Sequence, residues 1–100
     1  MPSSSLLSKS ELNAGLEAIG GGWEIVNGAL GKTFAFDSYL QGADFARSVA
    51  GIAEDMNHHP EITILWRKVA LSIFTHSAGG LTALDLQFAT EVEKLAGAEL

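Results

Sequence analysis

The chain has 100 residues, of which 47% are hydrophobic and 18% charged, so it is long enough for one folded domain with a small core. The formal net charge is −6 with only six Lys plus Arg, which excludes a basic surface for phosphate backbones, and we expect no direct nucleic-acid binding. The absence of cysteine excludes disulfide and thiolate chemistry, and no segment approaches the roughly 18 apolar residues of a membrane span. We expect a cytoplasmic protein with no membrane partner.

The first predicted element is a helix that follows a short N-terminal segment, residues 1–7, which we expect to be flexible. Ser8 and Glu11 have the spacing of a capping box. Apolar residues then repeat at helical intervals at Leu12, Leu16 and Ile19. The glycines at 20–22 interrupt this pattern, so the helix should end there.

Two strands joined by a tight turn are predicted next. Residues with large apolar side chains alternate with polar or small ones around Asn27-Gly28; they are Trp23, Ile25, Leu30, Phe34 and Phe36. This pattern is typical of a β-hairpin.

A long helix should begin after Ser38, which is a good N-cap. Its core-facing stripe consists of Phe45, Val49, Ile52, Ala53 and Met56. Pro60 restricts the backbone of His59 toward extended geometry, so we expect the helix to end around Asn57 or His58. The paired histidines therefore lie at its carboxyl end.

A second hairpin and a last helix complete the chain. Ile62, Ile64 and Trp66 alternate with other residues, and 69–74 continue the same period after Arg67-Lys68. Gly79-Gly80 then breaks the strand, and Thr82 is the expected N-cap of a final helix. The apolar residues of that helix at helical intervals are Leu84, Phe88, Val92 and Leu95. The order α-β-β-α-β-β-α predicts one α+β domain over 1–100, with a four-stranded antiparallel sheet and three helices packed on one face. Four strands leave two sheet edges to be protected, so self-association is expected.

The candidate functional residues lie within about a third of the sequence. They are Glu54, His58-His59-Pro60, Trp66, His76 and Asp85, and they include all three histidines. Histidine is the side chain that gives and takes protons near neutral pH, so the group has the composition of an acid/base site.

Other interpretations of these residues stay open at this point. Three histidines with a carboxylate could form a zinc centre, but adjacent histidines such as His58 and His59 tend to point in different directions. The spacing of Glu54 and His58 is more typical of a charge-assisted pair on one helix face. A histidine at a helix end can also simply bond the terminal carbonyls.

Asp85 and Trp66 each have a structural interpretation as well. Thr82 and Asp85 have the spacing of a capping box, and the Asp85 carboxylate could also orient His76. Trp66 alternates with Ile62 and Ile64, which is typical of a core residue, but it could instead form an aromatic wall for a flat heterocycle.

The spacing of this group resembles, element by element, the signature of the pterin-4a-carbinolamine dehydratases. Residues 75–85 are similar to that family's last strand-to-helix segment, and the resemblance covers roughly 12–95. One position departs: several members have an acidic residue where this chain has Asn57. The difference bears on the pH dependence and not on the reaction.

The resemblance implies a hydro-lyase that dehydrates 4a-hydroxytetrahydropterin to quinonoid dihydropterin and so recycles the pterin cofactor of aromatic amino-acid hydroxylases. It requires no cofactor and no metal. On the family pattern His58 and His76 transfer protons, His59 mainly binds and orients the pterin, and Glu54 and Asp85 are supporting carboxylates. We expect further substrate contacts from Asn57, Trp66, Thr75 and Ser77.

The resemblance also implies partners. They are the pterin substrate, a second copy of the chain in a homodimer or homotetramer, and an aromatic amino-acid hydroxylase in the same pathway. An alternative function is a dimerisation module that stabilises a transcription factor, a role that some family members also have.

Overall fold

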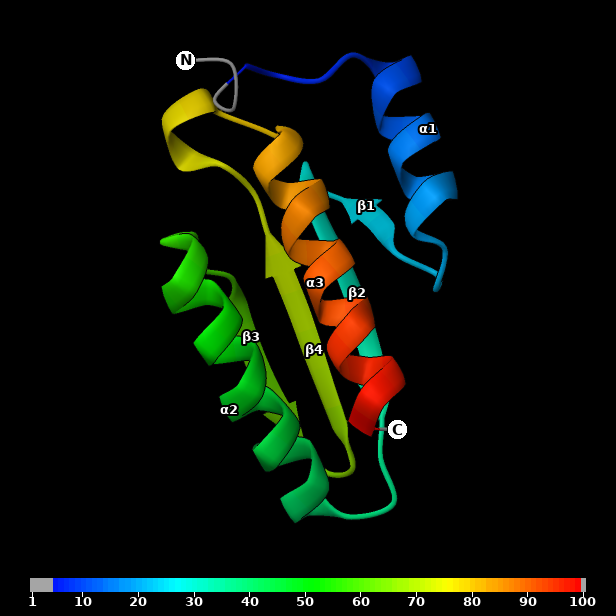
Figure 1. Cartoon of the computed structure of the whole chain (residues 1–100), viewed down its shortest axis with the longest axis vertical. Helices are drawn as coiled ribbons and strands as arrows, with labels where there is room; N and C mark the ends of the chain where they lie inside the picture. The colour runs from blue at the N-terminus through cyan, green and yellow to red at the C-terminus, as the bar shows by residue number, and fades with distance from the viewer. Residues whose placement is uncertain (1–4, 100) are drawn as a thin grey trace.

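The computed structural model describes residues 5–99 and contains the predicted elements in the predicted order (Figure 1). They are α1 (Lys9–Ile19), β1 (Glu24–Val26), β2 (Ala29–Ala35), α2 (Tyr39–Met56), β3 (Glu61–Leu65), β4 (Lys68–Ile73), the short 3-10 helix η2 (His76–Ala78) and α3 (Ala83–Glu99). The predicted α+β class is confirmed, with an antiparallel sheet and α helices on one of its faces. Only η2 was absent from the sequence prediction.

The N-terminal segment 1–7, expected to be flexible, lies partly outside the described residues. Residues 1–4 are not described, while the Leu7 N–H donates to the Leu81 carbonyl at 3.0 Å. Among the helices that the structure describes, none is long and apolar enough to cross a membrane.

The strand order is β1-β2-β4-β3, and every neighbouring pair is antiparallel. Asn27 and Gly28 both have positive φ, 53° and 81°, as a two-residue hairpin turn of the mirror-image type requires. The second turn consists of Trp66 and Arg67, because Leu65 pairs with Lys68. The prediction that Trp66 continues strand β3 is therefore wrong by one residue.

The core lies between the sheet and the helices. The buried strand residues that face the helices include Leu30, Phe34, Val69, Leu71 and Ile73. The rings of Phe34 and Phe36 pack on that of Phe45 in α2, with centroids 4.8 and 5.1 Å apart. Trp66 is 74% exposed, so its interpretation as a core residue is also wrong: the turn carries it past the end of the covered sheet.

The opposite face of the sheet carries no helix within residues 5–99 (Figure 1). Because side chains alternate along a strand, the residues next to the core-facing ones in the sequence point to this open face. Gly31 and Thr33 of β2 and Ser72 of β4 are among them. The open face is where a ligand can approach the sheet.

The carboxyl end of α2 has a specific cap that sets the course of the next residues. Asn57 takes the left-handed conformation, with φ 50° and ψ 44°. The His58 N–H donates to the Ala53 carbonyl at 3.0 Å, and the Asn57 N–H donates to the Glu54 carbonyl. This is the hydrogen-bond pattern of a Schellman cap, and it turns the chain sharply before β3. The predicted end of the helix at Asn57 or His58 is confirmed.

Candidate active site

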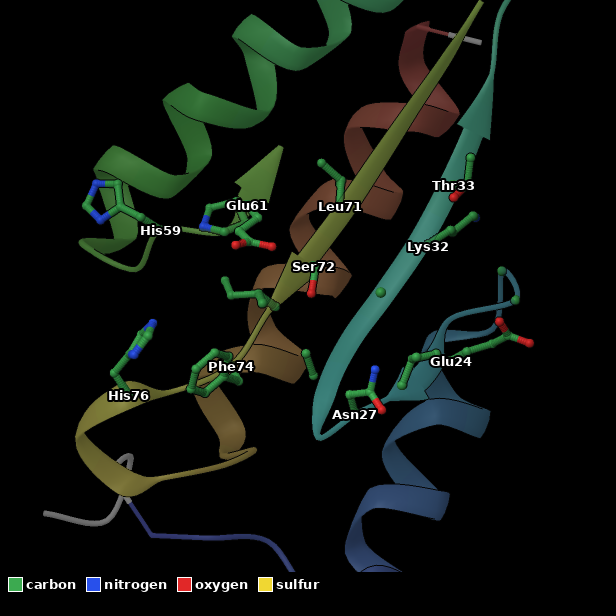
Figure 2. Close-up of a pocket in the computed structure, with 17 residues that line it drawn as sticks. Glu24, Asn27, Lys32, Thr33, His59, Glu61, Leu71, Ser72, Phe74 and His76 are labelled. Carbon is green, nitrogen blue, oxygen red and sulfur yellow. The ribbon is translucent and has the colours of Figure 1, made fainter. Parts of the chain in front are cut away.

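A cleft with a volume of about 890 Å³ lies on the open face of the sheet (Figure 2). Strands β2 and β4 form its floor, and β1 closes one side. The other side is formed by the α2–β3 connection and by the start of η2. Lining residues with side chains suited to binding or chemistry include His59, Glu61, Ser72, Phe74 and His76.

His59 and His76 come from different segments and both line this cleft (Figure 2). His59 follows the α2 cap, and its Nε2 lies 2.5 Å from Oε2 of Glu54 in the last turn of α2. His76 begins η2, and its ring packs against that of Phe74 with centroids 4.1 Å apart. Two histidines that line one cleft can deliver a proton to a bound molecule and remove another from it.

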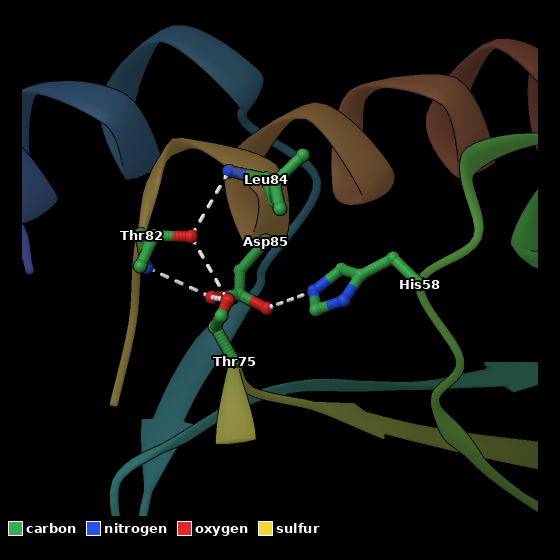
Figure 3. Close-up of polar contacts among 5 residues, drawn as sticks. All are labelled: His58, Thr75, Thr82, Leu84 and Asp85. Carbon is green, nitrogen blue, oxygen red and sulfur yellow. Dashed lines mark hydrogen bonds and ion pairs between the residues drawn. The ribbon is translucent and has the colours of Figure 1, made fainter. Parts of the chain in front are cut away.

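His58 lies in a different environment from its neighbour. Its Nε2 is 2.7 Å from Oδ1 of Asp85 in the first turn of α3 (Figure 3). The His58 side chain is only 11% exposed and that of Asp85 is fully buried. The other oxygen of Asp85 accepts hydrogen bonds from the Thr75 hydroxyl and the Thr82 N–H, each at 2.8 Å.

As expected from their adjacency, the paired histidines point in different directions; the sequence interpretation assigns proton transfer to His58 and pterin binding to His59. His59 lines the cleft, while the Nε2 of His58 is committed to Asp85. The carboxylates also pair differently from the expectation: Glu54 bonds His59 and not His58, and Asp85 bonds His58 and not His76. The two side chains diverge because the helix ends at the Asn57 cap and Pro60 favours extended backbone at His59, in which consecutive side chains point to opposite sides of the chain.

Asp85 combines the two roles considered for it, with a different histidine. Its carboxylate accepts from the Thr82 N–H, while the Thr82 hydroxyl accepts from the Leu84 N–H at 3.2 Å, so the start of α3 is capped as predicted.

Four residues expected to contact substrate do not line the cleft of this chain. Trp66 lies at the β3–β4 turn, and Asn57 is the exposed cap of α2. Thr75 is buried with its hydroxyl bonded to Asp85, and Ser77 lies on the exposed surface of η2. Their expected contacts with the pterin have no support from these positions.

Among the lining residues that sequence reasoning missed are Glu61, Ser72 and Phe74. Glu61 and Ser72 are direct partners across β3 and β4, and Phe74 lies two residues beyond Ser72. The alternation of side chains along the second hairpin could have predicted them, because it places these residues on the face opposite the core.

Carboxylates dominate the charges of the cleft. Glu24 and Glu61 line it together with Lys32, whose ammonium is paired at 2.6 Å with Glu93 of α3. The Trp23 indole N–H donates to the same Glu93 oxygen at 2.8 Å, which ties β1, β2 and α3 together. Within residues 5–99 no group of three or more His, Cys, Asp or Glu side chains gathers as in a metal site.

The sequence and the fold match a known family. The sequence model for pterin 4 alpha carbinolamine dehydratase matches residues 5–95, and the chain belongs to this family. It is 41% identical over 90 residues to a protein of Mycolicibacterium smegmatis named for pterin-4-alpha-carbinolamine dehydratase, covering 90% of this chain and 95% of the relative. A protein of the same name from Natronomonas pharaonis shows the same identity and coverage.

Two solved structures have the same fold. The transcriptional coactivator/pterin dehydratase from Brucella melitensis superimposes with a TM-score of 0.84 at 33% identity, covering 91% of this chain and 98% of that one. A pterin dehydratase-like protein identified as a RuBisCO assembly factor in the alpha-carboxysome superimposes with a TM-score of 0.61 at 28% identity, covering 76% and 88%. The fold is thus found in proteins with different described roles.

Proposed function

We propose that the chain is a hydro-lyase that dehydrates 4a-hydroxytetrahydropterin to quinonoid dihydropterin. The observation that carries the proposal is that His59 and His76 line one cleft in a member of the dehydratase family. The reaction needs one proton donor and one proton acceptor on the same ring system, and this pair of imidazoles can supply both.

The chemistry balances without a cofactor. One imidazolium gives its proton to the departing 4a-hydroxyl, the carbon–oxygen bond breaks, and water leaves. A second imidazole takes the proton of the adjacent ring nitrogen, whose electrons form the new carbon–nitrogen double bond. Positioned general acid and base groups contribute roughly 10² to 10⁴ in rate, which suits an elimination already assisted by the nitrogen lone pair.

The other residues have supporting roles in this proposal. Phe74 adds an apolar ring beside His76, against which a flat heterocycle can stack. Glu54 accepts a hydrogen bond from His59 and so helps to orient its ring. Proton transfer is assigned to His59 and His76, and His58 supports them from outside the cleft.

The proposal is tested by following the loss of 4a-hydroxytetrahydropterin by stopped-flow absorbance. We expect the decay rate to rise linearly with protein concentration above the uncatalysed rate, with quinonoid dihydropterin as product. A decay rate equal to that of buffer, for protein shown by circular dichroism to be folded, would exclude dehydratase activity.

A second candidate is a stabilising module for a transcription factor. It is favoured by the description of the Brucella melitensis structure as a coactivator and by apolar side chains exposed on and beside β3, namely Ile64, Leu65 and Trp66. Affinity isolation from the native host, compared with the turnover assay, separates the two functions. A specific transcription-factor partner together with absent turnover would favour this candidate.

We also propose a place for the protein in the cell. It acts in the cytoplasm as a homodimer or homotetramer, downstream of an aromatic amino-acid hydroxylase that supplies the 4a-hydroxypterin. The free outer edge of β3 and the apolar residues on it support self-association.

A further inference from the structure

We propose that four residues, Thr82, Thr75, Asp85 and His58, form a buried clamp that sets the separation and orientation of His59 and His76. This inference deepens the proposed function and rests on it. Its basis is the order of residues along the chain: His59 directly follows His58, and His76 directly follows Thr75. Each histidine of the cleft is thus covalently joined to one member of the clamp, and Asp85 bonds both of those members.

The hydrogen bonds of the clamp have one consistent direction (Figure 3). The Thr75 hydroxyl donates its single proton to Oδ2 of Asp85, so the Thr82 hydroxyl, 2.9 Å from it, must be the donor of that contact. With Oδ2 accepting two hydrogen bonds, Asp85 has the surroundings of a carboxylate, and Oδ1 accepts the third from the Nε2–H of His58.

Burial gives the clamp its rigidity. Thr75, Thr82 and Asp85 are each at most 4% exposed, so water cannot compete for their hydrogen bonds. Across residues 5–99 no buried side-chain nitrogen or oxygen lacks a partner. A fully satisfied buried network of this kind favours a single arrangement of its members.

The contact between His59 and Glu54 cannot replace the clamp. Their side chains are 55% and 76% exposed, and an exposed ion pair is weak and samples other geometries. The orientation of His59 must therefore come mainly from the backbone on either side of it, which His58 and Pro60 hold.

The segment that carries His76 is held at both ends. The Thr75 N–H donates to the Gly80 carbonyl at 2.9 Å, and the Thr75 carbonyl accepts from the Gly79 N–H at 3.0 Å, which closes the loop around η2. The hydrogen bond between the Thr75 and Thr82 hydroxyls joins the segment that enters this loop to the segment that leaves it. His76 lies inside the closed loop, so its position follows that of the clamp.

The test removes one hydroxyl at a time. Thr75→Val and Thr82→Val keep the side-chain shape but break the clamp, whereas Thr75→Ser and Thr82→Ser keep the hydroxyl. Thr90→Val is the matched control, because Thr90 is exposed and its hydroxyl donates to the Leu86 carbonyl one turn earlier in α3, away from the clamp. We expect both Val variants to lose kcat by roughly 10- to 100-fold, as displaced catalytic groups do, with an equal loss in kcat/KM. Both Ser variants should recover most of kcat, and the control should keep all of it.

Nitrogen-15 NMR of the three imidazoles gives a readout that is independent of turnover. We expect a proton on the Nε2 of His58 in the wild-type protein, and shifted His59 and His76 signals in the Val variants. Shifted signals in the Val variants, together with a wild-type protein that has no dehydratase activity, would support the clamp and reject the proposed function. Unchanged kcat and signals in folded Val variants would overturn the clamp. If the Val variants do not fold, the wild-type spectrum decides, since an unprotonated His58 Nε2 is incompatible with the clamp.

Discussion

His58 and His59 are neighbours in the sequence, yet their side chains have opposite surroundings. That of His58 is 11% exposed and faces a fully buried carboxylate, while that of His59 is 55% exposed, pairs with the exposed Glu54 and lies at the rim of the cleft. One residue therefore contributes to stability and the other is available to a ligand. Their substitutions should have different effects on the free energy of unfolding.

We predict that His58→Ala lowers the free energy of unfolding by roughly 3 to 5 kcal/mol, because it leaves the Asp85 carboxylate buried without its hydrogen-bonded partner. His59→Ala should change it by less than about 0.5 kcal/mol, as most exposed substitutions do. Urea unfolding followed by circular dichroism measures both. Equal losses in the two variants would contradict the environments described for these side chains.

Metal removal is a second test at this scale. The reaction proposed here uses imidazole acid/base chemistry. Each of the two paired histidines already has one ring nitrogen within hydrogen-bond distance of a carboxylate, His58 with Asp85 and His59 with Glu54. We predict full kcat after exhaustive chelation. Elemental analysis that finds one tightly bound zinc per chain, with turnover lost on its removal, would contradict the mechanism.

Sequence spacing singled out residues that the structure brings near the cleft, but it did not predict their orientation. It singled out His59, His76 and both carboxylates, and it could not tell which of the paired histidines faces the cleft. That choice depends on the left-handed Asn57 and on a contact between His58 and Asp85, 27 residues apart. The position of Trp66 was missed for a similar reason, since alternation alone does not place a turn to within one residue.

At the scale of elements, the floor of the cleft depends on one glycine in the middle of β2. Gly31 lies on the open face opposite Ser72 of β4. A Cβ atom at this position would lie 2.9 Å from the Leu71 carbonyl oxygen, which is backbone and cannot rotate away. Any side chain there would push β2 and β4 apart beneath the cleft.

We predict that Gly31→Ala lowers the free energy of unfolding by about 1 to 3 kcal/mol, the usual cost of overpacking. Gly51→Ala is the matched control in α2, where an added Cβ meets nothing within 4 Å. There the same substitution should raise stability by about 0.5 to 1 kcal/mol, because alanine is the better helix former. Thermal unfolding of the two variants should give shifts of opposite sign, and a destabilised Gly51→Ala with an unaffected Gly31→Ala would contradict this.

The helices and strands were largely predictable because their signals are local. The Ser8 capping box, the Ser38 N-cap and the Asn27-Gly28 turn all occur where the sequence indicated. Helix η2 was missed because a 3-10 helix of three residues is too short to leave a periodic pattern.

At the scale of the whole molecule, the sheet ends in two unequal edges. Strand β1 has three residues and strand β3 has five, and Ile64 on β3 is exposed together with neighbouring Leu65 and Trp66. An exposed strand edge with apolar side chains is a template for pairing with another chain. The edge of β3 is thus the better candidate for association.

We predict that light scattering reports a dimer or tetramer at micromolar concentration. Ile64→Lys should weaken association, because a charge on an edge strand opposes pairing. Ile25→Lys on β1 is the matched control and should leave the molar mass unchanged. A folded wild-type protein that is monomeric at all concentrations, and fully active, would contradict the prediction.

The most direct test of the central claim is the kcat for 4a-hydroxytetrahydropterin of His59→Ala, His76→Ala and the double variant, with Asp55→Ala as an exposed control on α2. If the two cleft histidines carry the proton transfers, each single variant should lose about 10-fold or more, and the double variant should approach the uncatalysed rate. Asp55→Ala should match the wild type. A double variant that stays folded and keeps the wild-type kcat would show that the histidines of the cleft do not catalyse the dehydration.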